Sequence, residues 1–201
     1  ALATRRIRLG TAISSVFVRS APTIAMAAAC VDYYSGGRLV LGLGSSHKVQ
    51  VEPEHGLSFA KPVQRLRETV DIVRRLLRDG EVSYQGSVFS IDRFDLWFPP
   101  LRAAVPIYLA GVFPAMLEIA GETAEGAILA WSTVTHARTA VRHVAEGARR
   151  AGKRPEDVEV AALVSCTVAS DRDAARDQMR GPIATYAGRF PRYRRLMVES
   201  G

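Results

Sequence analysis

Short apolar segments of the kind found in β-strands alternate along the chain with segments of helical periodicity, and this order restricts the possible folds most. Each apolar segment is almost continuous in hydrophobic and β-branched residues, which is typical of strands covered on both faces. Strands that alternate with helices in this way form a parallel sheet with the helices outside it. The sequence therefore predicts an α/β fold with five strands, at Ile7–Ser14, Arg38–Gly44, Val105–Ala110, Ala127–Trp131 and Val158–Ala169.

Capping and turn residues indicate where the helices between these strands begin and end. Ser20 is suited to cap a helix that has Pro22 in its first turn and that ends before two glycines. Ser170 and Asp173 have the spacing of a capping box for the last helix. The remaining expected segments are helices at Pro62–Arg78, Pro114–Glu125 and Thr135–Ala151, and a long loop at Ser45–Ala60.

Residues Val82–Phe98 depart from the alternation, because two short β-like runs flank Gln85 and Gly86. This pattern predicts a β-hairpin inserted between a helix and the next strand of the main sheet. With the hairpin as an insertion, residues 1–201 are expected to form a single domain.

Gly42 and Gly44 raise the question of a dinucleotide-binding fold. However, the third glycine of that fingerprint is replaced by His47, and no predicted helix follows the strand end directly. Small residues at such a strand end also allow a ligand or a neighbouring strand to come close. We therefore favour a (β/α)8 TIM-barrel fold over a doubly wound sheet.

Composition excludes several classes of protein. With 48% hydrophobic and 23% charged residues, the chain has the profile of a packed globular protein. The net charge of +7 comes largely from arginines spread along helices, which favours a solvated surface suited to an anionic ligand over a nucleic-acid partner. The longest membrane-like stretch, Thr23–Val31, is too short to cross a bilayer. Cys30 and Cys166 lie in apolar runs and are expected to be buried, and no cluster predicts a metal site.

The carboxyl ends of the strands are where a barrel of this kind has its active site. Most residues there are small or carry hydroxyl groups, which suits a large planar ligand lying against the backbone. His47 follows a strand by three residues, in a long loop of the type that often binds ligands. It could act as an acid or base, or only bond a ligand or cap the loop. Trp131 is either a pocket wall or core, and surface positions are expected for Glu52, Glu54, His55, His136 and His143.

Three segments resemble the luciferase-like monooxygenase superfamily, and most closely its branch that uses the deazaflavin coenzyme F-420. They are RIRLGTAIS, SGGRLVLGLGSSHKVQVEPEHGLSFAKPVQRLRETVDIVRRLL and VPIYLAGVFPAMLEIAGETAEGAILAW, and GRLVLGLG with its loop is the most specific part. The resemblance implies an incomplete TIM barrel that holds the third to seventh strands and the hairpin. Both ends of the chain read as interrupted helices, so a piece of a longer polypeptide is expected.

The resemblance also implies a coenzyme site made of three groups of residues. A bulge with a non-prolyl cis peptide supports the ring, a turn after the next strand contacts ring or phosphate, and backbone amides leading into a helix bind the phosphate. Relatives often have glycine at the last position of the third group, which is a phenylalanine here. The groups are Thr11, Ala12 and Ile13; Gly44, Ser45 and Ser46; and Gly111, Val112 and Phe113.

The function implied by the resemblance is hydride transfer between bound F-420 and a small organic substrate. His47 is the candidate catalytic residue, because a sugar-phosphate dehydrogenase of the superfamily has a catalytic glutamate at the matching position. Two alternatives stay open: an FMN-dependent monooxygenase that inserts one oxygen atom, and a non-catalytic barrel that binds flavin or nothing. We expect a cytoplasmic enzyme that forms a homo-oligomer, a dimer, without nucleic-acid or membrane partners.

Overall fold

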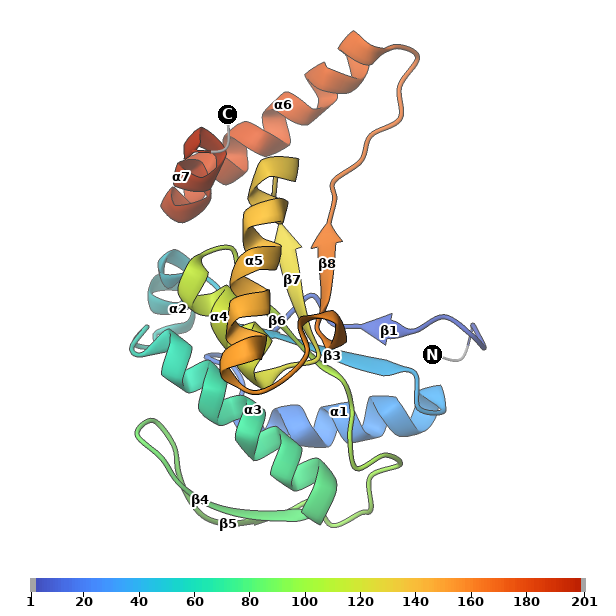
Figure 1. The fold of residues 1–201 in the computed structure, drawn as a ribbon, viewed down its shortest axis with the longest axis vertical. Helices are drawn as coiled ribbons and strands as arrows, with labels where there is room; N and C mark the ends of the chain where they lie inside the picture. Colours follow the sequence, from blue (N-terminus) through green and yellow to red (C-terminus); the bar gives the residue numbers. More distant parts are fainter. Residues whose placement is uncertain (1–2, 200–201) are drawn as a thin grey trace.

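A parallel sheet that curls through half a barrel forms the centre of the computed structural model, which describes residues 3–199 (Figure 1). Its strand order is β1-β3-β6-β7-β8, the short β2 also pairs with β3, and every pair is parallel. The expected fold class is confirmed. The strands are β1 (Leu9–Gly10), β2 (Ser14–Ser15), β3 (Leu39–Gly44), β6 (Ile107–Ala110), β7 (Gly126–Ala130) and β8 (Glu159–Leu163).

Helices cover the outer face of the sheet. As predicted, the Ser20 side chain caps the first of them by accepting a hydrogen bond from the Thr23 amide (3.2 Å), and Gly36 ends it with a φ of 66°. Leu66 and Val70 belong to the apolar stripe that the next long helix buries against the core. The helices on this face are α1 (Ala21–Ser35), α3 (Pro62–Asp79), α4 (Pro114–Thr123) and α5 (Val134–Arg150).

The first predicted strand is interrupted by a bulge that separates β1 from β2. The Ala12–Ile13 peptide within it is cis, as the family resemblance implies. The Thr11 hydroxyl donates to the Gly42 carbonyl (2.8 Å) and accepts from the Gly42 amide (2.9 Å). A Cβ at Gly42 would lie 1.8 Å from the Thr11 carbonyl oxygen, so only glycine allows this approach. The glycine that suggested a dinucleotide fingerprint thus allows the bulge to form.

Helices α4 and α5 cross at two glycines. A Cβ at Gly121 would lie 2.0 Å from the Val144 carbonyl oxygen, and a Cβ at Gly147 would lie 1.9 Å from that of Glu118. The two helix backbones are therefore close enough that neither position accommodates a side chain.

The predicted hairpin is present as the antiparallel pair β4 (Glu81–Gln85) and β5 (Ser90–Asp95). The buried carboxylate of Glu68 on α3 anchors its turn. This carboxylate accepts hydrogen bonds from the amides of Ser87 (2.8 Å), Val88 (3.1 Å) and Phe89 (2.9 Å). The hairpin is thus fixed to the outside of α3 and away from the carboxyl ends of the strands (Figure 1).

Several local expectations were wrong. The segment predicted as a loop contains a helix, α2 (Lys48–His55), which begins after a three-residue turn that follows β3. The last strand ends at Leu163, because pairing with β7 ends at that residue. Asp171, and not Ser170, caps the helix that follows, by accepting from the Ala174 amide (2.9 Å). Cys30 and Cys166 are both exposed, since one lies on the outer side of α1 and the other follows the end of β8.

Two helices lie beyond the carboxyl ends of β7 and β8 (Figure 1). They are α6 (Arg172–Arg189) and α7 (Pro191–Glu199), which an extended connection joins to β8. Phe190 and Leu196 are buried, and the Phe190 ring contacts His47. These helices therefore cover the end of the sheet at which a barrel has its active site.

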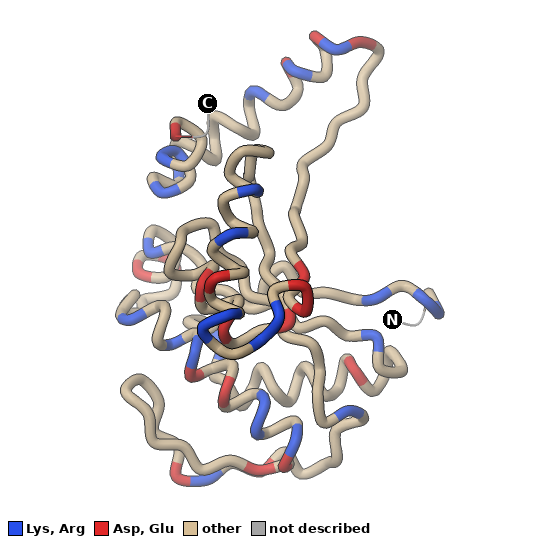
Figure 2. Tube along the Cα trace, viewed as in Figure 1, with Lys and Arg blue, Asp and Glu red and all other residues tan. Residues whose placement is uncertain are grey.

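Positive charge is spread over the molecule and not gathered in one stripe. Figure 2 shows Lys and Arg on the N-terminal segment, on α3, on α5 and on the two terminal helices. Many of these side chains pair with acids, as Arg150 does with Glu118 (2.9 Å) and Glu122 (2.7 Å). In the part of the chain that the structure describes, no helix is long and apolar enough to cross a membrane.

Candidate functional site

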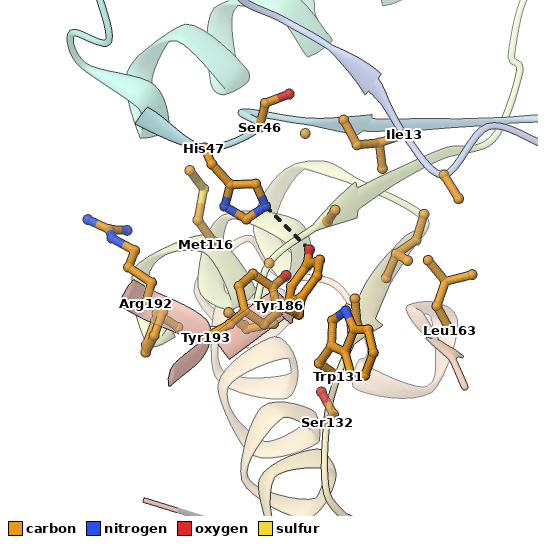
Figure 3. A pocket seen from close by; sticks show the side chains of 18 of the residues that line it. Ile13, Ser46, His47, Met116, Trp131, Ser132, Leu163, Tyr186, Arg192 and Tyr193 are labelled. Carbon is orange, nitrogen blue, oxygen red and sulfur yellow. Dashed lines mark hydrogen bonds between the residues drawn. The ribbon is translucent and has the colours of Figure 1, made fainter. Parts of the chain in front are cut away.

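A cavity of about 830 Å³ lies at the carboxyl ends of the strands, between the sheet and the α6–α7 pair (Figure 3). Residues that follow β3, β6, β7 and β8 line it on the sheet side. Met179, Ile183 and Tyr186 of α6 line it from the other side, together with Arg192 and Tyr193 of α7. The site expected at the strand ends therefore has the size of a ligand pocket.

The sequence-predicted coenzyme residues lie around this one cavity. All of them line it except Thr11, which supports the bulge from behind through its bonds to Gly42. A Cβ at Gly44 would lie 2.9 Å from the Ile13 side chain, so the glycine allows the bulge to pack on the strand end. The residues of the three groups that line the cavity are Ala12, Ile13, Gly44, Ser45, Ser46, Gly111, Val112 and Phe113.

The segment that leads into α4 is the candidate phosphate subsite. The Gly111 amide already donates to the Ile128 carbonyl (3.2 Å), so an anion would have to bind the amides of Val112 and Phe113. Arg192 of α7 lies above the Phe113 ring, with its guanidinium carbon 5.8 Å from the ring centroid. A helix N-terminus and a cation therefore face the same end of the cavity, which favours a negatively charged group there.

His47 lies at the rim, and its backbone, not its side chain, caps α2. The residue has the extended backbone of an N-cap, its carbonyl accepts from the Gln50 amide (2.9 Å), and its side chain makes no capping bond. The half-buried imidazole lies 3.5 Å, Nε2 to Oη, from the Tyr186 hydroxyl (Figure 3). The ring is thus available to the cavity.

Burial lowers the pKa of His47 below its ordinary value of 6.5, and the positive charge of Arg192 lowers it further. Both effects disfavour the imidazolium, so the neutral ring predominates at pH 7. A neutral imidazole that faces a cavity can accept a proton from a bound ligand.

An aromatic cluster that sequence reasoning missed surrounds His47. Tyr186 lies at its centre, with ring centroids 4.8 Å from Trp131, 4.5 Å from Phe190 and 5.0 Å from Tyr193. The His47 ring lies 4.2 Å from the Phe190 ring. The close spacing of aromatics at 186, 190 and 193 was the available signal, and the structure divides them between the end of α6, the residue that joins the two helices and α7. Trp131, for which wall and core were both considered, lines the cavity.

His136 was expected at the surface but takes part in the support of the site. Its Nε2 lies 2.7 Å from the Val112 carbonyl oxygen and its Nδ1 lies 3.0 Å from the Ser132 hydroxyl. It therefore links the loops that follow β6 and β7. Glu54 is exposed as expected and pairs with Arg189 of α6.

Glu118, His143 and Glu146 place ligand atoms within 4.8 Å of one another on the outer helices. Arg150 pairs with Glu118 (2.9 Å) and also approaches Glu146 (4.0 Å). A guanidinium thus already neutralises these carboxylates, and the group lies away from the cavity.

The curled sheet and the cavity at its carboxyl edge define a protein of the barrel class with a ligand site at the strand ends. The profile of the luciferase-like monooxygenase family matches residues 1–201, so the chain belongs to that family.

Individual relatives agree with this assignment. The 5,10-methylenetetrahydromethanopterin reductase of Archaeoglobus fulgidus is 34% identical over 184 residues, which cover 92% of this chain and 54% of the relative. Among solved structures, the coenzyme F-420-dependent tetrahydromethanopterin reductase of Methanopyrus kandleri superposes with a TM-score of 0.82 at 26% identity, over 92% of this chain and 58% of that one. An F-420-dependent secondary alcohol dehydrogenase, in complex with an F-420–acetone adduct, gives 0.81 at 26% identity, over 89% and 56%. The chain spans little more than half the length of these relatives.

Proposed function

We propose that the protein is an oxidoreductase that transfers a hydride between bound coenzyme F-420 and a small organic substrate. The observation that carries the proposal is the convergence of the bulge, the turn after β3 and the segment before α4 on one cavity. Relatives whose names include F-420-dependent enzymes support the same coenzyme. The expected homodimer and cytoplasmic location are part of this proposal.

The residues present fit a large planar coenzyme with an anionic tail. Because Gly42 and Gly44 have no side chain, the bulge can pack close to the strand end. Backbone and not side chains would then lie against a flat ring. The amides of Val112 and Phe113 and the charge of Arg192 would hold a phosphate. When bound, F-420 supplies the hydride chemistry, and the protein supplies orientation and electrostatics.

His47 would accept or donate the proton that accompanies hydride transfer. Its neutral ring can accept the proton of a substrate hydroxyl as that substrate is oxidised, and its protonated form can return the proton in the reverse direction. The α6–α7 pair would exclude water from this step, because it covers the cavity and contacts the imidazole through Phe190.

A titration of the full-length protein with F-420 and, separately, with FMN tests the proposal. We expect a Kd of about 1 μM or below for F-420 and weaker binding of FMN. Reduction of bound F-420 by an alcohol, followed by absorbance, would then report hydride transfer. Tight binding of FMN without binding of F-420 would favour the monooxygenase alternative, and binding of neither would favour a non-catalytic barrel.

A further inference from the structure

The rings of Trp131 and Tyr186 form a joint aromatic surface on one side of the cavity. Their centroids are 4.8 Å apart and their planes are tilted by 30°, so the two rings pack against each other. Both residues line the cavity although Trp131 follows β7 and Tyr186 lies in the last turn of α6. The two packed rings therefore present aromatic, largely apolar surface to the cavity.

The backbone of Trp131 is in the left-handed region, with a φ of 55°. This conformation is costly for a bulky side chain, and such residues persist at sites where the conformation is needed. A glycine or asparagine would adopt it more readily, yet the position holds the largest side chain. The indole of Trp131 thus lies at the cavity although its backbone conformation costs free energy.

The remaining surroundings of this surface are largely uncharged. Leu163, Met179 and Ile183 also line the cavity, and among the described residues that line it Arg192 is the one Lys, Arg, Asp or Glu. Figure 3 shows Ile13 and Ser46 on one side of the cavity and Trp131 and Tyr186 on the other. The aromatic surface thus faces Ile13 and Ser46, which the proposed function assigns to the coenzyme.

We propose that Trp131 and Tyr186 form the substrate-binding wall and select compounds with a flat conjugated ring next to the reacting carbon, over saturated compounds of equal size. This inference rests on the proposed function, because it assumes that F-420 binds on the opposite side of the cavity. A planar substrate ring can stack on the aromatic surface that this wall turns to the cavity, which orients the substrate between coenzyme and His47, whereas a puckered saturated ring makes fewer contacts with an aromatic ring.

The test compares 2-acetylnaphthalene with its saturated counterpart 2-acetyldecalin, which has the same carbon skeleton without planarity. Calorimetric titration of the full-length protein with each ketone, with and without F-420, gives the two Kd values. We expect the planar ketone to bind about tenfold more tightly. Replacement of Trp131→Leu or Tyr186→Leu should remove most of this preference, while Tyr186→Phe, which keeps the ring, should retain it.

Trp97 provides the matched control, because it is a tryptophan with positive φ that is 94% exposed on the hairpin side. Trp97→Leu should leave both Kd values unchanged, and thermal unfolding shows whether each variant is folded. Equal affinity for the two ketones, no binding of either up to about 1 mM, or an equal loss for both in the Leu variants would overturn the inference. The F-420 titration is a separate readout: normal F-420 binding without planar preference contradicts the inference alone, and planar preference without F-420 binding contradicts the proposed function alone.

Discussion

His47 is the residue on which the proposed chemistry depends most. If it transfers the proton that accompanies the hydride, His47→Ala should lower kcat by about a hundredfold, the usual scale for loss of a general acid or base. F-420 affinity should change little, because the proposed phosphate subsite consists of backbone amides and Arg192 and does not include His47. Steady-state kinetics with a coenzyme titration check this. A modest and parallel loss of affinity and kcat would instead mean that the ring only shapes the rim.

Arg192 should affect the pH dependence of the reaction rate, because its charge lowers the pKa of His47. Burial is the larger cause of the lowered pKa of His47 and the Arg192 charge the smaller, so Arg192→Gln should raise that pKa part of the way back. For alcohol oxidation, which needs the neutral ring, the acidic limb of the pH–rate profile should then move to higher pH. The control is Arg194→Gln on the same helix, outside the cavity lining, which should leave the limb in place. A limb that does not move in the Arg192 variant would mean that another group titrates.

At the scale of elements, Glu68 attaches the hairpin to α3. Burial alone would raise its pKa, but hydrogen bonds from Gln64, Phe89 and Ser87 lower it from 4.5 to about 2. A lowered pKa means that the charged form stabilises the fold above pH 4.5 and that this stabilisation is lost as the pH falls from 4.5 towards 2. Glu68→Gln should therefore cost about 3 kcal/mol of unfolding free energy at neutral pH and progressively less in that acidic range.

Denaturant unfolding at several pH values measures this difference. Asp92→Asn provides the control, since that carboxylate is exposed on the same hairpin. It should change the unfolding free energy by less than about 0.5 kcal/mol. A Glu68→Gln effect that does not shrink in acid would show that packing, and not charge, accounts for its cost.

The glycine crossing of α4 and α5 gives a prediction in which two effects have opposite signs. Helix propensity alone would make Gly147→Ala stabilising by about 1 kcal/mol. The new Cβ would, however, lie 1.9 Å from the backbone oxygen of Glu118, so the helices must separate, at a cost of about 1–3 kcal/mol. We expect a lower Tm for Gly147→Ala, and a slightly higher Tm for Gly188→Ala in α6, where nothing lies within 4 Å of the added Cβ. A higher Tm for both would show that the crossing is loose.

Periodicity and capping were enough to predict most elements, but not those that depend on distant contacts. Helix α2 was missed because Lys48–His55 is polar and contains Pro53, so it shows no apolar stripe. The end of the last strand was placed too late because apolar residues continue after its pairing ends; Val168 is apolar but 95% exposed. The expectation of the cis peptide and the candidate coenzyme positions came from resemblance, since no local pattern encodes them. The aromatic cluster forms only when α6 folds back over the sheet.

At the scale of the whole molecule, the described sheet has two edges without a neighbouring strand. β1 and β2 pair only with β3, and β8 pairs only with β7, among the described residues. Unpaired strand edges are templates for association. We expect the 201-residue chain, expressed as such, to self-associate in sedimentation velocity experiments, and addition of F-420 to leave this association unchanged because the cavity lies elsewhere. A monodisperse monomer that unfolds cooperatively would show that these edges are protected in solution.

The α6–α7 pair is joined to the sheet only by residues 164–171, which lie outside helices and strands and are mostly exposed. No residue of α6 is buried, and the pair contacts the rest of the molecule through the aromatic cluster around His47, through Arg192 at the Phe113 ring and through the Arg189–Glu54 pair. The α6–α7 pair can therefore move away from the cavity without breaking any strand pairing. The residence time of a bound ligand then does not depend on the stability of the sheet. Ligand binding and release can be fast in a molecule whose core unfolds rarely, because the few contacts that confine the ligand are not those that keep the chain folded.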